Sequence, residues 1–384
     1  MRFEFASASQ IIFGAGTIKE LPNICSQMGK NAFLICGKEV SRFHKIIERL
    51  NDHKIKTDIF SVLGEPTSEV VCAATEKARI LNCDMVIGIG GGSVIDTGKV
   101  VAALLKNEGE LIDYLEVIGR SKSLKNPSAP YIAIPTTAGT GAEVTRNSVI
   151  TSIEHHVKVS MRSLFMLPKT AIIDPDLTVS MPPSLTASTG LDALTQLIEP
   201  YVSNMSNPLT DSLCREGIIR GSRSLKAVYR DGTNISGRED MAIASLFSGF
   251  ALANAKLGAA HGLAAAIGGM LPAPHGIICA RVLPHVMEAN VSALCIRGND
   301  SRFISRYNEI AKILTGNNNA NFNDGVKWIK ELCMDLDVAP LSQFGLVEKD
   351  FNVIIEKTQR ASSTKGNPIQ LTDEELYGIL AKAA

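Results

Sequence analysis

The stretch Asp84-Met-Val-Ile-Gly-Ile-Gly-Gly-Gly-Ser93 decides the fold class. Its first part is a short apolar run of strand length, and its glycines form a turn before residues 94–105, whose pattern predicts a helix. Glycines let a backbone approach a phosphate closely, and a helix N-terminus adds free N–H groups and a favourable dipole. The stretch therefore predicts a strand–turn–helix unit with phosphate-binding residues at Gly90, Gly91, Gly92 and Ser93.

The same alternation of strands and helices runs through the first half of the chain. Strand-like runs are predicted at residues 10–13, 31–36, 56–62 and 130–135, and helices at residues 17–28, 40–52 and 68–81. Such an alternation predicts a mainly parallel sheet with helices on both faces. Ligands of these sheets bind beyond the carboxyl ends of the strands.

A second polar turn, Pro135-Thr-Thr-Ala-Gly-Thr-Gly-Ala-Glu-Val-Thr145, follows the last of these strands. The hydroxyls of Thr136, Thr137 and Thr140 suit contacts with a diphosphate or a ribose. Either turn could be a tight connection that binds nothing, but two such turns favour a nucleotide site. The first turn lacks the full GxGxxG pattern, which argues against an ordinary Rossmann N-terminus. Asp96 either supports this turn or is a first-turn acid favoured by the helix dipole.

Four polar side chains of the second half could surround one ion. Asp192 and Gln196 are four residues apart in a predicted helix and therefore share one face. His261 and His275 lie in Gly/Ala-rich and Pro-His-Gly segments. A carboxylate, an amide and two imidazoles suit a borderline divalent ion such as Fe or Zn. The alternative is that the histidines are ordinary buried residues, since spacing alone cannot pair distant ligands.

Composition narrows the class of protein. The chain has 384 residues, which predicts two domains. Hydrophobic residues make up 45% and charged residues 20%, as in globular enzymes. Lys+Arg and Asp+Glu both number 39 and no basic stripe is visible, which argues against a nucleic-acid partner.

Location is predicted from the cysteines and from the apolar runs. The eight cysteines form no CxxC pair, so we expect reduced thiols. The beginning of the sequence lacks the apolar region of a signal peptide, and no uncharged apolar run reaches membrane-spanning length. We therefore expect a cytoplasmic protein without a membrane partner.

Pro182-Pro183 breaks the chain, and strand-like runs fade after it. We predict an α/β domain over residues 1–180 and an all-helical domain over residues 181–384. The helices predicted in the second domain cover residues 185–203, 208–229, 237–255, 261–270, 302–314, 323–336, 348–357 and 372–383.

In their order along the chain, these motifs resemble the iron-containing (group III) alcohol dehydrogenases. The resemblance extends from Ile11 to about residue 290 and includes Glu143 and Asp174-Pro-Asp. It implies an N-terminal α/β dinucleotide-binding domain and an all-α C-terminal domain, the dehydroquinate-synthase-like architecture. It also implies a metal in the cleft between them, and reversible hydride transfer between NAD(P)H and an aldehyde or ketone.

The resemblance assigns further residues and reveals two departures. In the family, one Asp and three His hold the metal, and Asp192, His261 and His275 match three of these positions. Gln196 stands where the second ligand is normally His, and Ala265 where a further His often follows. Lys158 falls where the family places a lysine near the nicotinamide ribose, and Asn147 matches a cofactor-lining Asn. We interpret the neighbouring pair His155 and His156 as surface residues.

The turn after the second strand bears on the choice of cofactor. Family members that prefer NAD often carry an acid there, which binds the ribose 2′-OH. This chain has Gly37 and then Lys38, which would attract rather than repel a 2′-phosphate. Glu39 stands close enough to reach back, and Gly37 could be only a turn glycine. The sequence therefore favours NADP(H) over NAD(H).

The leading prediction is an NAD(P)-dependent enzyme that interconverts a small alcohol and an aldehyde or ketone with the help of Fe or Zn. Dimers are the common state of such enzymes. One alternative is a metal-independent reductase of the maleylacetate-reductase type, in which His261 and His275 would donate hydrogen bonds or protons directly. Others are a lyase like dehydroquinate synthase, for which no phosphate-binding cluster is visible, and a nucleotide-binding protein without catalysis.

Overall fold

The computed structural model describes residues 2–155, 157–298 and 300–384, which form two compact units. The α/β unit comprises residues 6–137 and 141–178, and the helical unit comprises residues 2–5, 138–140 and 179–384. The sequence predicted a single division at residue 180 and did not foresee the two short segments of the helical unit. His155 is exposed, as predicted, and His156 lies outside the described residues.

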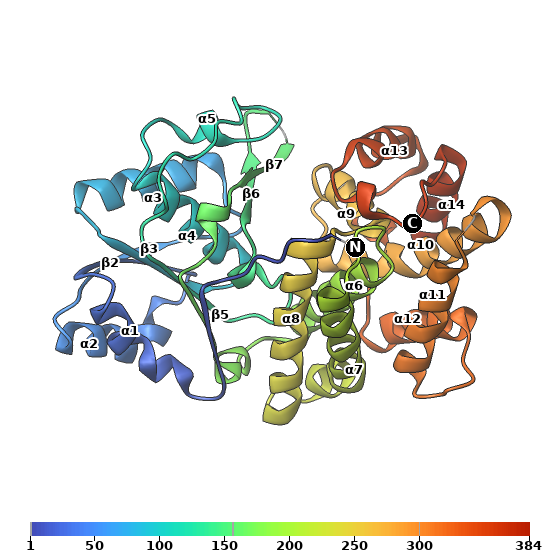
Figure 1. Ribbon diagram of the computed structural model, residues 1–384, viewed down its shortest axis with the longest axis horizontal. Helices are drawn as coiled ribbons and strands as arrows, with labels where there is room; N and C mark the ends of the chain where they lie inside the picture. Colours follow the sequence, from blue (N-terminus) through green and yellow to red (C-terminus); the bar gives the residue numbers. More distant parts are fainter. Residues whose placement is uncertain (1, 156, 299) are drawn as a thin grey trace. The chain divides into compact units, whose positions relative to one another are not determined.

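A six-stranded sheet forms the centre of the α/β unit (Figure 1). All its strand pairs are parallel, in the order β1-β8-β5-β4-β2-β3, which confirms the predicted sheet type. The strands are β1 (Gln10–Phe13), β2 (Asn31–Cys36), β3 (Lys56–Ser61), β4 (Met85–Gly90), β5 (Tyr131–Pro135) and β8 (Thr170–Ile173). Sequence patterns did not predict β8, which lies between β1 and β5.

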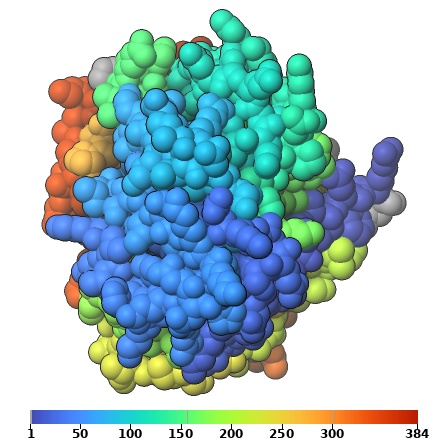
Figure 2. Space-filling model, turned by 90° about the vertical axis from the view of Figure 1, so that its left-hand side faces the viewer, coloured from blue at the N-terminus to red at the C-terminus, as the bar shows by residue number. Residues whose placement is uncertain are grey.

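Side chains of the central strands alternate between two apolar layers, because successive residues of a strand point to opposite faces. On β2, Phe33 and Ile35 contact the layer formed by α3 (Ser68–Ile80) and α4 (Gly92–Leu104). Leu34 and its neighbours contact the opposite layer, formed by α1 (Leu21–Ser26) and α2 (His44–Asp52). Figure 1 shows the two helix pairs on opposite faces, and Figure 2 shows the surface that the blue and light-blue segments around them form.

Short elements complete this unit. They are η1 (Thr17–Glu20), η2 (Val40–Phe43), α5 (Leu111–Tyr114), η3 (Ala142–Val144), β6 (Asn147–Ser152), β7 (Val157–Arg162), η4 (Leu164–Met166) and η5 (Pro175–Thr178). The helix predicted over residues 17–28 is in fact η1 followed by α1. Pro22 lies in the first turn of α1, where its missing N–H costs nothing. The antiparallel pair β6–β7 was not predicted.

The helical unit is built around one large apolar core. Its helices are α6 (Pro183–Tyr201), α7 (Pro208–Arg230), α8 (Ile235–Ala255), α9 (Ala259–Gly268), α10 (His275–Arg297), α11 (Ser301–Thr315), α12 (Phe322–Asp335), α13 (Phe351–Arg360) and α14 (Asp373–Ala383), with the short turns η6 (Leu341–Phe344), η7 (Glu348–Asp350) and η8 (Thr364–Gly366). Its all-helical class agrees with the prediction.

Helix α10 is the one long helix of this unit that the sequence patterns did not predict. It contains Pro284, and its buried residues lie on nearly every side rather than along one stripe. A helix that is apolar all round gives no amphipathic period, and an internal proline normally breaks a helix. For both reasons, the sequence pattern did not indicate this 23-residue helix, which begins at His275.

Helix hydropathy and the cysteines are relevant to the predicted cellular location. Within the described residues, α10 has the length and hydropathy of a membrane span, and α8 and α9 would qualify together although they are bent by 99°. However, 67% of the span-like window of α10 is buried inside the unit, as is usual for the core helix of a large globular unit. The eight cysteines, all in the described part of the chain, form no disulfide in the structure, and all but Cys72 and Cys295 are buried.

Candidate metal and cofactor sites

Helix α6 presents three polar side chains on one buried face. Asp192, Gln196 and Glu199 are spaced by four and three residues, and each is less than 5% exposed. The Gln196 amide nitrogen donates a hydrogen bond of 3.2 Å to Asp192 Oδ2. This bond fixes the direction of the carboxylate and leaves Asp192 Oδ1 for another partner.

Glu199 positions His261 at the beginning of α9. Its carboxylate accepts hydrogen bonds from the backbone N–H groups of Ala260 and His261, which the first turn of a helix leaves unpaired. Glu199 Oε2 also lies 2.6 Å from Nδ1 of His261. A carboxylate only accepts, so Nδ1 is the donor and Nε2 is directed to the other side of the ring. Sequence reasoning had not assigned Glu199 a role.

The Pro-His-Gly segment starts α10 directly against α6. His275 is the first residue of α10 and follows Pro274 at the N-cap. A Cβ atom at Gly276 would lie 1.9 Å from the backbone oxygen of Ser188, so only glycine allows this approach. The close contact fixes the first turn of α10 beside the Asp192 face of α6. Cys279, four residues after His275, lies on the same side of the helix.

Asp192, His261, His275 and Cys279 each offer a ligand atom, and these atoms all lie within 4.8 Å of one another. The predicted convergence of Asp192 with the two histidines is therefore present. Asp192 Oδ1 lies 3.3 Å from His261 Nε2 and 3.9 Å from His275 Nε2. Cys279 was not predicted to take part. Among the described residues, this is the one such group of His, Cys, Asp and Glu.

The cluster fits a metal ion. Asp192 Oδ1, His261 Nε2 and Gln196 Oε1 are buried and make no hydrogen bond. Each unpaired buried polar atom costs about 1–3 kcal/mol, so a group of them indicates a place where an ion or water binds. Carboxylate, imidazole and amide donors suit a borderline divalent ion.

The electrostatics of the cluster favour a cation as well. Burial by itself raises the pKa of Asp192, but the imidazoles of His261 and His275 hold that pKa below its ordinary value. Burial lowers the pKa of His261, yet Cys279, Asp192 and Glu199 together raise it well above the usual value. Burial likewise opposes the thiolate of Cys279, and the two imidazoles lower its pKa. The excess of acidic groups thus attracts positive charge to this point.

The two predicted phosphate-binding turns lie side by side at the carboxyl edge of the sheet. Strands β4 and β5 pair in parallel with Gly90 opposite Pro135, and Thr136 N–H donates to the Gly90 oxygen. The α4 helix begins at Gly92, so its free N–H groups are at this edge. A Cβ atom at Gly90 would lie 2.5 Å from a methyl carbon of Val94, which explains the glycine. The segment 138–140, which includes Thr140, belongs to the helical unit.

Asp96 and Asn147 take part in a buried network that joins α4 to β6. Lys99 is fully buried, and its ammonium group donates to Asp96 Oδ1, to Thr145 Oγ1 and to the backbone oxygen of Asn147. Asp96 Oδ2 accepts from Val149 N–H, so both carboxylate oxygens already have protein partners. This bonding favours the supporting role for Asp96 over direct contact with a ligand.

Lys158 and the pair Gly37–Lys38 lie on different parts of the α/β unit. Lys158 is on β7, and its ammonium group lies 2.6 Å from Glu65 Oε1. Gly37 and Lys38 directly follow β2, with Lys38 exposed. A Cβ atom at Gly37 would meet nothing within 4 Å, so no steric conflict requires glycine at this position.

Family comparisons decide the class of this protein. The profile of the iron-containing alcohol dehydrogenases matches residues 8–175, and that of the C-terminal domain of the Fe-containing alcohol dehydrogenase family matches residues 186–384. The chain belongs to the iron-containing alcohol dehydrogenase family. Members of this family bind NAD(P) and a metal.

Relatives of this dehydrogenase agree along almost the whole chain. Alcohol dehydrogenase 4 of Saccharomyces cerevisiae is 33% identical and covers 97% of this chain and 96% of its own length. The 1,3-propanediol dehydrogenase of Klebsiella pneumoniae is 32% identical, with coverage of 99% and 98%. The crystal structure of a 1,3-propanediol oxidoreductase superimposes with a TM-score of 0.92 at 32% identity and covers 100% of both chains.

These similarities confirm the predicted fold and the predicted enzyme class. The protein is an NAD(P)-dependent oxidoreductase acting on alcohols and aldehydes or ketones, and the comparisons do not favour the alternative activities.

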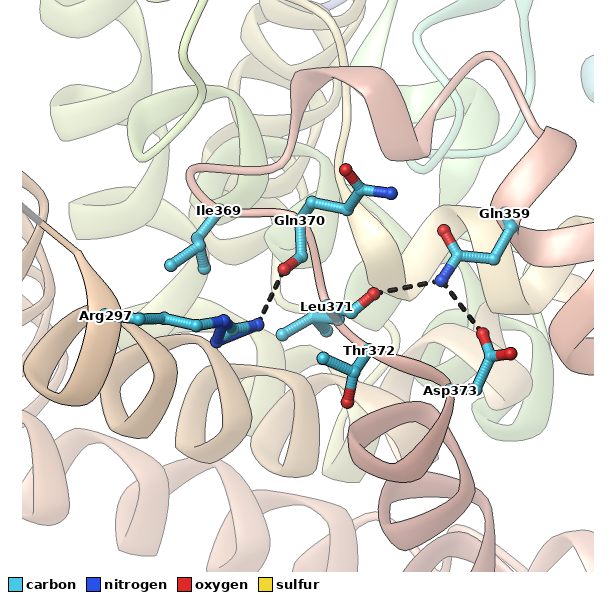
Figure 3. A pocket seen from close by; sticks show the side chains of 7 residues that line it. All are labelled: Arg297, Gln359, Ile369, Gln370, Leu371, Thr372 and Asp373. Atoms are coloured by element: carbon cyan, nitrogen blue, oxygen red, sulfur yellow. Dashed lines mark hydrogen bonds between the residues drawn. The ribbon is translucent and has the colours of Figure 1, made fainter.

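An open depression elsewhere in the helical unit is structural in character (Figure 3). It has a volume of about 520 Å³ and is lined by Arg297, Gln359 and the segment 369–373. Arg297 donates to the backbone oxygen of Gln370, and Gln359 donates to that of Leu371. These bonds hold the segment to α10 and α13, and none of the lining residues belongs to the Asp192–His261–His275–Cys279 cluster.

Proposed function

We propose that this dehydrogenase holds a divalent metal ion in the helical unit and uses it in the interconversion of a small alcohol and its carbonyl compound. The observation that carries the proposal is the group of buried polar atoms without hydrogen bonds, on Asp192, Gln196 and His261. His275 lies beside them, with its side chain 41% exposed. It is therefore the member of the cluster that a substrate can reach from solvent.

Each side chain has a defined task. Asp192, His261 and His275 bind the ion, and Gln196 is the fourth ligand that the sequence predicts. An ion bound there would supply Lewis-acid polarisation of the substrate oxygen. Glu199 holds His261 with Nδ1 protonated, so that Nε2 keeps its lone pair for the ion. No side chain needs to act as a dedicated base, because the alcohol proton can leave to water or to a ribose hydroxyl.

The α/β unit serves as the dinucleotide-binding domain in this proposal. Backbone N–H groups of Gly91, Gly92 and Ser93 at the start of α4 bind the diphosphate. The hydroxyls of Thr136 and Thr137 add contacts from the neighbouring turn, and Thr140 remains a contact predicted from the sequence. Asp96 and Lys99 hold α4 on β6 and so keep the glycine turn in place. Lys158 and Asn147 remain predicted contacts of the nicotinamide half. Hydride transfer is the chemistry of the nicotinamide itself, and the chain supplies binding and orientation.

Metal removal tests the proposal. We expect purified protein to carry about one Fe or Zn per chain and to lose its carbonyl reductase activity on exhaustive dialysis against a strong chelator. Activity should return when the same ion is added back. The measurement is elemental analysis in parallel with NADPH and NADH oxidation across a panel of aldehydes and ketones. Full activity in metal-stripped protein would support the metal-independent reductase instead.

The cofactor preference depends on the position after β2. We propose NADP(H), because Gly37 leaves room for a 2′-phosphate and Lys38 offers a positive charge. Gly37→Asp introduces a carboxylate that can accept the ribose 2′-OH and repels a 2′-phosphate. We expect the ratio of kcat/KM for NADH over NADPH to rise by about tenfold or more, corresponding to about 1.4 kcal/mol. Gly37→Asn is the uncharged control, and an equal shift in both variants would contradict the electrostatic explanation.

Two further predictions accompany this function. The homodimer and the cytoplasmic location stay predictions from the sequence, and sedimentation of the purified protein would test the first.

A further inference from the structure

Cys279 lies in the metal cluster, although no sequence pattern pointed to it. Its side chain is fully buried, and Sγ lies 3.7 Å from Nε2 of His275. His275 and Cys279 occupy positions i and i+4 at the start of α10, so both project from one side of that helix. A thiolate is among the strongest donors that a protein offers to Zn or Fe.

The distances between donor atoms match the edges of a tetrahedral metal site. Bonds of about 2.0–2.1 Å to nitrogen or oxygen and about 2.3 Å to sulfur give edges of about 3.3–3.6 Å. His261 Nε2 and Asp192 Oδ1 lie 3.3 Å apart, and Cys279 Sγ and His275 Nε2 lie 3.7 Å apart. His275 Nε2 and Asp192 Oδ1 lie 3.9 Å apart, and the four donor atoms all lie within 4.8 Å of one another. Small movements would therefore bring all four atoms to bonding distance from one centre.

A second, independent observation indicates that something binds at this centre. Asp192 Oδ1 and His261 Nε2 belong to side chains that are about 95% buried, and neither atom has a hydrogen-bond partner. Since His261 Nδ1 donates to Glu199, Nε2 needs either a second proton or a cation in front of it. Gln196 Oε1 is likewise buried without a hydrogen bond, while the Gln196 amide nitrogen donates to Asp192 Oδ2. A neutral amide oxygen is, however, a weaker donor to Zn or Fe than a thiolate.

We propose that Cys279 is a metal ligand, and that its thiolate, rather than the Gln196 amide, completes the set formed by Asp192, His261 and His275. This inference rests on the proposed function, because it names the fourth donor of the same ion. Because Gln196 stands where the family has a histidine ligand, Asp192, His261 and His275 alone would give only three donors. The Cys279 thiolate brings the number of protein donors back to four. Gln196 then acts through its hydrogen bond, which holds the Asp192 carboxylate toward the ion.

The thiolate changes the charge and the metal preference of the site. The Asp192 carboxylate and the Cys279 thiolate together carry two negative charges. These charges neutralise a divalent cation when both imidazoles are neutral. A soft sulfur donor favours Zn or Fe over hard ions such as Mg or Mn. Loss of Cys279 should therefore weaken binding by more than the roughly 10–100-fold that loss of an outer hydrogen-bond partner costs.

Cobalt substitution tests the proposal without an activity measurement. Protein stripped of its ion and loaded with Co(II) should bind about one equivalent and show thiolate-to-cobalt charge-transfer absorption in the near ultraviolet. Cys279→Ser should abolish that absorption and raise the dissociation constant for Co(II) by more than about 100-fold. Gln196→Ala should keep the absorption, since the sulfur is still present. Cys295→Ser, which changes an exposed cysteine of the same helix, is the matched control and should behave as wild type.

X-ray absorption of zinc-loaded wild-type protein needs no variant and keeps the test decisive if Cys279→Ser does not fold. We expect one sulfur neighbour at about 2.3 Å. Tight Co(II) and Zn(II) binding with only nitrogen and oxygen neighbours would overturn the role of Cys279 while leaving the metal-dependent function intact. Failure of the wild-type protein to bind any of these ions would overturn both.

Discussion

His261→Ala is expected to remove the metal ion and to lower kcat/KM for carbonyl reduction by about 10³-fold or more. His261 Nε2 lies 3.3 Å from Asp192 Oδ1, and both atoms are buried without a hydrogen bond. Without the imidazole the site loses a neutral donor and its Lewis-acid chemistry, which is worth several kcal/mol, or about three factors of ten. The measurement combines elemental analysis of the variant with steady-state kinetics.

Binding of NADPH should survive in this variant, because the glycine turn at residues 90–93 and the neighbouring Thr136 and Thr137 belong to the α/β unit. Fluorescence titration with NADPH checks that expectation. His285→Ala is the matched control: His285 is a largely buried histidine of α10 that contacts Glu288 and takes no part in the cluster. It should keep both metal and activity. Near-normal turnover in His261→Ala with no bound ion would show that His261 is not a metal ligand.

Gly276→Ala is expected to produce the largest loss of stability among single-methyl substitutions near the site. The added Cβ atom would lie 1.9 Å from the Ser188 backbone oxygen and 2.7 Å from its carbonyl carbon. Backbone atoms of α6 cannot rotate away, so α10 has to move. We expect a cost of about 3 kcal/mol or more, which lowers Tm by roughly 6–12 °C in a unit of this size.

Metal affinity should fall in the same variant, because displacement of α10 moves His275 and Cys279 away from Asp192. Thermal unfolding and zinc titration measure the two effects. Gly378→Ala is the control, since a Cβ atom at this helical glycine meets nothing within 4 Å. That change should be neutral or add about 0.5–1 kcal/mol of stability. Equal melting temperatures for the two variants would contradict the close-contact explanation.

Most of the α/β unit could be predicted because its signals are local. Buried parallel strands such as β2 and β4 are continuous apolar runs, and the glycine turns follow them directly. Strand β8 was missed, and the helix predicted over residues 17–28 was too long because a new helix, α1, begins at Leu21 with Pro22 in its first turn. The Asp192–Gln196 pair was visible from its helical spacing alone.

Three decisive features of the site had no local signal. Helix α10 is apolar on nearly all sides and contains Pro284, so the spacing of His275 and Cys279 could not be recognised as helical. Glu199 acts on His261 from 62 residues away along the chain. The need for glycine at position 276 comes from Ser188, which belongs to another helix.

The sequence by itself determined the parallel sheet, the two glycine- and threonine-containing turns beyond β4 and β5, the family and three of the residues that meet in the cluster, because each depends on neighbours within a few positions or on a motif in fixed order. Only the tertiary structure decided which atoms face one another: it brought Cys279 beside His275, gave His261 its orienting carboxylate, and left Asp192 Oδ1 and His261 Nε2 buried without hydrogen bonds. Such pairings are set by the packing of α6, α9 and α10. Contacts between helices that are distant along the chain produce no periodic pattern in the sequence from which they could be predicted.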